Sequence, residues 1–161
     1  MNLLATSPEW LTWLLVLALL AAALQDAAML KISNVSVIAV LFMAVGAMLI
    51  SGIEVDIWQN LVAFAVVLSA GTLAYSKGIL GGGDVKLLAA VLLWADGATA
   101  LKLLAAIFIC GGLLALLIIS LRIFASVSAS QRIRVLRPGS GIPYGIAIAA
   151  GAILIITTFT P

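Results

Sequence analysis

Two aspartates in this sequence could perform chemistry together, Asp26 and Asp84, because each lies at the edge of an apolar run. Placing a carboxylate at membrane depth costs roughly 2.5–3.5 kcal/mol on insertion scales, so such a residue is a functional candidate by default. Two carboxylates held close together cannot both ionise readily, and they share one proton. One can then take a proton from water while the other polarises a carbonyl group. The pair predicts peptide hydrolysis by two catalytic aspartates without a metal or cofactor, and leaves open which of them is protonated.

Three consecutive glycines, Gly81, Gly82 and Gly83, directly precede Asp84. Glycine releases the backbone from helix and lets another chain approach closely. We therefore predict that these glycines form an extended, substrate-binding segment, against which a peptide lies strand against strand. A flexible hinge is the alternative interpretation. Lys86 is a further candidate for substrate binding, and for this residue the alternative is an anchor at the membrane interface.

Composition predicts an all-α integral membrane protein, with residues 1–161 forming a single membrane-embedded domain. Of the 161 residues, 65% are hydrophobic and 9% are charged, whereas a soluble domain has about 25% charged residues. The sequence has no histidine, and its single cysteine, Cys110, lies in an apolar run. The arginines between residues 125 and 141 are expected to contact anionic membrane lipid. They lack interleaved aromatic residues, which argues against binding of nucleic acid.

Apolar runs predict a bundle of about six transmembrane helices, at about residues 10–24, 35–50, 57–75, 85–94, 101–124 and 142–159. Helix starts are expected at Ser7-Pro8-Glu9, with Pro8 as the first helical residue, and at Asp56, with Gln59 completing a capping box. The run at 85–94 would reach only about 15 Å as a helix, which buries Asp84. Asp84 could also cap this helix.

Charge predicts the orientation of the bundle. With six spans, the basic residues fall on one side, except for Lys102. By the positive-inside rule that side is cytoplasmic, so both termini lie outside. The outer side then holds the four tryptophans, which we expect to form an interface belt, and four acids: Glu9, Glu54, Asp56 and Asp96. Asp26 and Asp84 remain as the acids of the inner side, at a similar depth.

Three motifs resemble those of a known family. Gly81-Gly82-Gly83-Asp84 resembles the GxGD signature of intramembrane aspartyl proteases, and the following Lys86-Leu87 is similar to the prepilin peptidase branch. Asp26, followed by Ile32-Ser33-Asn34, resembles the first motif of that family, with serine where the family has proline. We therefore expect the second span to start less rigidly. The segment from Pro143 to Ala149 resembles the motif of the last helix.

This resemblance implies an enzyme that removes the leader peptide of prepilins or pseudopilins, substrates with an N-terminal leader and a hydrophobic helix. It implies the bacterial inner membrane, with the active site facing the cytoplasm. The connection at residues 25–34 is too short for the cytosolic insert of larger members, so the chain resembles the small Flp/Tad type without methyltransferase activity. The alternatives are a small proton-coupled transporter and a structural membrane subunit. A transporter predicts paired broken helices in two repeats, whereas only one glycine break precedes an acid here.

Overall fold

A computed structural model describes residues 1–52, 55–124, 134–137 and 140–159, which form helices and no strand. Within these residues, four helices are long and apolar enough to cross a membrane: α2 (Glu9–Met29), α3 (Asn34–Ser51), α4 (Ile57–Ser76) and α6 (Gly97–Phe124). Shorter elements are α1 (Leu3–Thr6), α5 (Gly82–Leu92), the 3-10 turn η1 (Arg134–Leu136) and α8 (Tyr144–Ile156). Glu54 and Arg132, which the charge argument used, lie outside the described residues. The prediction of an all-helical chain is confirmed for the described part.

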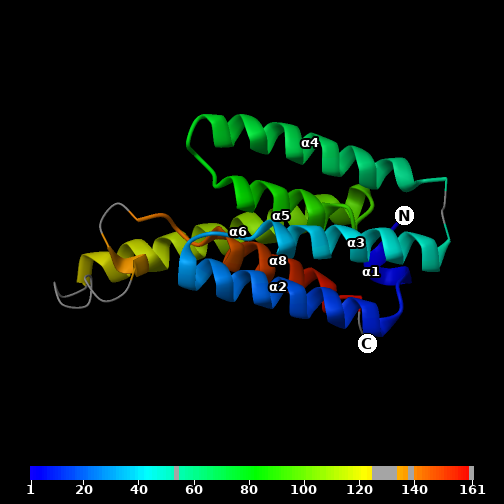
Figure 1. Cartoon of the computed structure of the whole chain (residues 1–161), viewed down its shortest axis with the longest axis horizontal. Helices are drawn as coiled ribbons and strands as arrows, with labels where there is room; N and C mark the ends of the chain where they lie inside the picture. Colours follow the sequence, from blue (N-terminus) through cyan, green and yellow to red (C-terminus); the bar gives the residue numbers. More distant parts are fainter. Residues whose placement is uncertain (53–54, 125–133, 138–139, 160–161) are drawn as a thin grey trace.

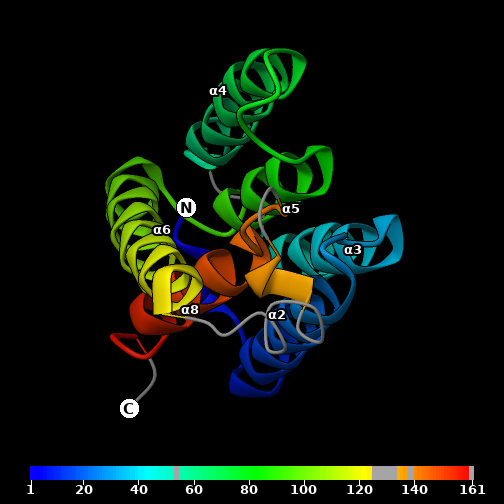
Figure 2. The ribbon, with the colours of Figure 1, turned by 90° about the vertical axis from the view of Figure 1, so that its left-hand side faces the viewer.

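Consecutive helices from α2 to α8 run in opposite directions along the long axis (Figure 1). Seen end-on, α5 lies between α4 and α3, and α8 lies between α6 and α2 (Figure 2). Seven of the eleven α5 residues are buried, whereas Asn60 is the one buried residue of α4. An apolar helix buried on all sides belongs to a core, and a long apolar helix with an exposed surface suits lipid. Helix α5 therefore lies in the core of the bundle, to which α2, α3, α6 and α8 also contribute buried residues.

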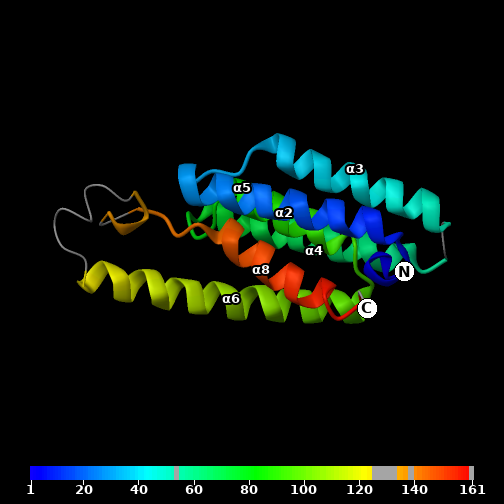
Figure 3. The same cartoon turned by 90° about the horizontal axis from the view of Figure 1, so that it is seen from below.

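Small residues allow α8 to pack closely against its long neighbour α6 (Figure 3). A Cβ atom added to Gly151 would lie 2.6 Å from the backbone Cα and N atoms of Ile107. Close backbone approach at glycine is typical of helix packing in membranes, where association depends on van der Waals contact. This contact holds α8 at a fixed depth beside α6.

The first predicted span was too short at its C-terminal end. Helix α2 continues past Leu24 to Met29, so that Gln25 and Asp26 are helical. The helix ends because Leu30 adopts a left-handed conformation, φ 53°, and its N–H donates to the Asp26 carbonyl oxygen at 2.7 Å. A left-handed residue just after the last turn is a common helix stop. Asp26 therefore lies inside the last turn of a rigid helix.

Predictions for other ends of the helices also need correction. Pro8 is the N-cap residue of α2 and Glu9 the first helical residue, one position later than predicted. The capping box at Asp56 does not form, because the Gln59 Oε1 atom accepts the Gly97 N–H at 3.1 Å. The last predicted span, residues 142–159, contains the thirteen-residue α8, which reaches only about 20 Å.

Trp94 corrects the prediction that all four tryptophans form an interface belt. Its side chain is fully buried, and its Nε1–H donates to the Val40 carbonyl oxygen at 3.3 Å. Trp10, Trp13 and Trp58 are more than half exposed, as a belt requires. Trp94 differs because it follows the central helix α5, where a carbonyl group is available to its indole N–H.

Candidate active site

Asp26 of α2 and Asp84 of α5 meet at one end of the bundle. Both line a cavity of about 560 Å³, which also borders Arg122 and Tyr144. Both also line a smaller cavity of about 250 Å³ beside Ile32. The fold thus places both aspartates at the same two cavities, although they are far apart in the sequence. The geometry thus provides a pair of acids in a space large enough for a peptide segment.

The backbone of α8 holds the Asp26 carboxylate. The Gly145 N–H donates to Asp26 Oδ2 at 2.7 Å. Gly145 is the second residue of α8, and a first-turn N–H has no partner within its own helix, so it is free to bind a carboxylate. A Cβ atom at Gly145 would lie 2.9 Å from both Asp26 Cβ and Asp26 Oδ2. The glycine is therefore part of the fit between α8 and Asp26.

Gly145 belongs to the motif from Pro143 to Ala149, but the motif predicted no role for this residue. The available signal was its position just after Pro143, at the start of an apolar run. Pro143 is the N-cap residue of α8. A glycine in the first turn lowers helix propensity, so its presence there indicates a close contact.

Asp84 is the third residue of α5, and the Gly81 residue is the N-cap. The Asp84 carboxylate lies over the N-cap residue, since a Cβ atom at Gly81 would lie 2.5 Å from Asp84 Oδ2. This arrangement matches the returning acid of a capping box, and the helix dipole favours a negative charge there. Asp84 is therefore not the N-cap residue that the alternative interpretation expected, but lies in the first turn of α5 and borders both cavities.

The prediction of an extended glycine segment is wrong for Gly82 and Gly83, which form the first turn of α5. Gly81 alone has an extended backbone, with φ −73° and ψ 141°. A Cβ atom at Gly83 would lie 3.0 Å from Ile32 Cβ and 3.1 Å from the Ile32 carbonyl oxygen. A Cβ atom at Gly82 would lie 3.3 Å from the Tyr75 ring. The glycines let neighbouring segments pack tightly against the start of α5, and all three border the smaller cavity.

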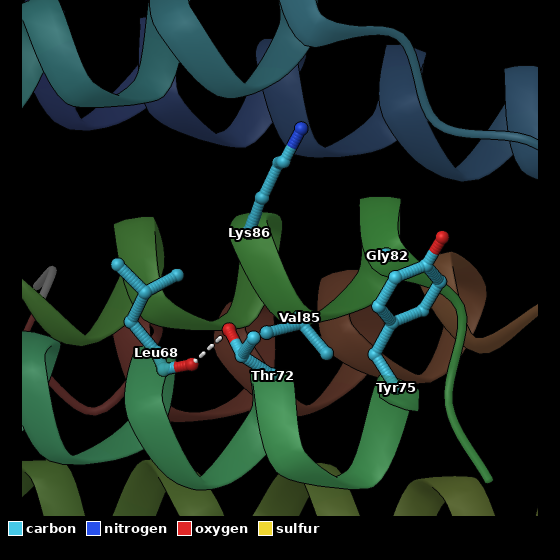
Figure 4. Close-up of a pocket in the computed structure, with 6 residues that line it drawn as sticks. All are labelled: Leu68, Thr72, Tyr75, Gly82, Val85 and Lys86. Carbon is cyan, nitrogen blue, oxygen red and sulfur yellow. Dashed lines mark hydrogen bonds between the residues drawn. The ribbon is translucent and has the colours of Figure 1, made fainter. Parts of the chain in front are cut away.

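Lys86 faces away from the aspartates. It is two residues beyond Asp84, which places it about 200° around the helix. Its Nζ donates to Asn34 Oδ1 at 3.1 Å. The side chain borders a different cavity, between α4 and α5, together with Thr72 and Tyr75 (Figure 4). Lys86 is therefore not brought together with Asp26 and Asp84.

Arg122 is a residue of this site to which the sequence assigned only a topological role. At the end of α6, its guanidinium group donates to the carbonyl oxygens of Val135, Ser140 and Gly141, at 2.8–3.1 Å. These residues lie in the segment that leads into α8. Arg122 therefore holds the approach to Gly145 while bordering the larger cavity. In the described part of the chain, no three potential metal ligands come together.

The sequence also matches a known protein family. The model of the type IV leader peptidase family matches residues 13–120. The matched region includes both aspartates and ends before α8. No curated protein and no solved structure matched the chain.

Proposed function

This chain belongs to the type IV leader peptidase family, and we propose that it is an aspartic endopeptidase that removes the leader peptide of prepilins or pseudopilins. The observation that carries the proposal is that Asp26 and Asp84, from different helices, border the same cavity. Family membership implies a peptidase, and a pair of carboxylates is sufficient for peptide hydrolysis without a further protein nucleophile.

The proposed reaction uses the two carboxyl groups as one acid–base pair. The ionised carboxylate removes a proton from a water molecule, and the oxygen of that water attacks the carbonyl carbon of the scissile peptide. The protonated member donates its proton to the carbonyl oxygen, and a tetrahedral intermediate forms. On its collapse the C–N bond breaks and the leaving amine takes a proton from the pair. Gly145 keeps the Asp26 carboxylate oriented throughout, because its N–H donates to Oδ2.

We propose that six helices cross the membrane, with both termini outside and the aspartates near the cytoplasmic face of the bacterial inner membrane. Basic residues gather at the aspartate end of the bundle, among them Lys31, Lys77 and Arg122, and such clusters mark the cytoplasmic side. The eleven residues of α5 reach only about 16 Å. Asp84, in the first turn of this short helix, would therefore lie deeper in the bilayer than the ends of the long helices. A leader whose apolar helix lies in the bilayer would present its cleavage site at this depth.

The short connection between α2 and α3 supports the small Flp/Tad type. Four residues, 30–33, separate Met29 from Asn34. A chain this short has no room for the cytosolic insert that larger relatives carry at this place, so we propose peptidase activity without methyl transfer.

Cleavage of a prepilin precursor by the purified protein in detergent tests the proposal. Asp26→Asn and Asp84→Asn should each lower kcat by at least about 100-fold, since acid–base catalysis contributes 10²–10⁴-fold. Asp56→Asn is the matched control, because Asp56 is exposed, makes no side-chain cap bond and lies at the opposite end of the bundle. Its kcat should equal that of the wild type, and all variants should elute from a sizing column like the wild type.

Near-normal cleavage by either active-site variant would refute the assignment of the pair. A wild-type protein that leaves every precursor intact but conducts protons in liposomes would favour the transporter alternative.

A further inference from the structure

The turn at residues 30–33 lies against the first turns of α5 and α8, beside the two aspartates. The Ile32 carbonyl oxygen lies 3.1 Å from the position of a Cβ atom at Gly83, the neighbour of Asp84. The Ile32 Cδ1 atom lies 3.1 Å from the position of a Cβ atom at Gly145, the donor to Asp26. One residue of the turn therefore contacts α5 and α8 next to both aspartates.

A small hydrogen-bond cluster holds this turn in place. The Gln25 Oε1 atom accepts the Ser33 N–H at 2.9 Å. Ser33 Oγ accepts the Ser36 N–H at 3.2 Å and so caps α3. Ser36 Oγ donates to Gln25 Oε1 at 3.5 Å. The cluster joins the last turn of α2 to the first turn of α3, and Ile32 lies between the two joined points.

We propose that Gln25 is a positioning residue, which sets the separation of Asp26 and Asp84 by holding Ser33, and with it Ile32, between α5 and α8. Gln25 precedes Asp26 in the same helix turn but borders neither aspartate cavity. Its effect on the reaction passes through the turn. The inference rests on the proposed peptidase function for its kinetic readout, and on the hydrogen bonds of the cluster for its structural readout.

The backbone of Ser33 provides a way to separate this role from general stability. Its φ is −74°, within the range at which a proline ring holds φ. Ser33→Pro would remove the N–H that Gln25 accepts, together with the Oγ atom that caps α3, while stiffening the same backbone conformation. In the S33P background, the effect of Gln25 should therefore fall to that of its remaining long contact with Ser36 Oγ, at 3.5 Å.

A double-mutant cycle in kcat tests the proposal with the wild type, Q25L, S33P and the double variant. Q25L should lower kcat about five-fold in the wild-type background, the factor that corresponds to one neutral hydrogen bond. In the S33P background, Q25L should lower kcat by less than about two-fold. Equal losses in the two backgrounds would overturn the proposal, since Gln25 would then not act through Ser33.

Gln59→Leu is the matched control. The Gln59 Oε1 atom also accepts a backbone N–H, that of Gly97 at 3.1 Å, but at the opposite end of the bundle. This variant should lower Tm and leave kcat unchanged. A loss of kcat equal to that of Q25L would show that any weakening of the bundle slows the reaction, and would overturn a positioning role. If Q25L does not accumulate, Gln25→Asn replaces it, because a side chain shorter by one methylene cannot reach Ser33.

Amide hydrogen exchange across residues 31–36 distinguishes failure of this inference from failure of the proposed function. Exchange of the turn should accelerate in Q25L and change much less between S33P and the double variant. If the wild type cleaves no precursor while this exchange pattern holds, Gln25 does hold the turn, and it is the proposed peptidase function that fails. If Q25L does not accelerate exchange, Gln25 does not hold the turn, whatever the activity.

Discussion

At the residue scale, Asp26 depends on the backbone of another helix. The Gly145 N–H donates to its carboxylate, and no side chain could be added at Gly145 without meeting Asp26. Orientation by a backbone donor leaves few degrees of freedom, because the donor moves only with α8. The position of α8 against α2 and α6 therefore controls the geometry of the proposed catalytic pair.

Gly145→Ala should lower kcat about 100-fold, because its methyl group must displace the Asp26 carboxylate, and a misplacement near 1 Å has a cost of this size. Precursor cleavage measures the loss. Gly112→Ala in α6 is the matched control, since its Cβ atom meets nothing within 4 Å. This control should keep its kcat and gain up to about 1 kcal/mol in the free energy of unfolding. Wild-type kcat in Gly145→Ala would show that Asp26 needs no such fit.

At the scale of elements, the start of α5 packs against the turn before α3. Ile32 lies against Gly83, so added volume there must separate α5 from the turn. If Gly83 lay in an extended loop, substitutions there would leave the thermal stability of the protein unchanged. The helical first turn predicts a loss of both activity and stability.

Gly83→Ala should therefore lower both kcat and Tm, and Gly83→Val should lower them further, because its branched side chain is larger and stiffer in a helix. Overpacking of this kind typically costs about 1–3 kcal/mol. Gly46→Val in α3 is the matched control for helix propensity, since a Cβ atom at Gly46 meets nothing within 4 Å. Equal Tm values for Gly83→Val and Gly46→Val would contradict tight packing at the start of α5. Thermal unfolding in detergent and precursor cleavage provide the two measurements.

At the scale of the whole molecule, the proposed six-span topology places Ser76 inside and Thr6 outside. Both residues are exposed, whereas the Ser7 hydroxyl is buried without a partner and is a poor site for labelling. In a Cys110→Ala background, a membrane-impermeant maleimide should label Thr6→Cys in intact spheroplasts. It should label Ser76→Cys only after lysis. Labelling of Ser76→Cys before lysis would reverse the orientation, and labelling of both would change the number of crossings.

The sequence by itself determined the helical class, the approximate position of the long apolar helices and the two acids at one end of the bundle. These features depend on the composition and length of each segment, because the cost of placing a charge in lipid is local. The family resemblance rested on short motifs, which are also local.

Only the tertiary structure decided which face of each helix meets which neighbour. It buried Trp94, turned Lys86 toward Asn34, wound Gly82 and Gly83 into α5 and brought Gly145 to Asp26. Hydrophobic periodicity could not predict these contacts, because lipid tails and the protein core are equally apolar and the helices are apolar all round. In such a bundle, neighbours are chosen by close packing at small residues and by single hydrogen bonds. Both are properties of two segments together, which no single segment of the sequence contains.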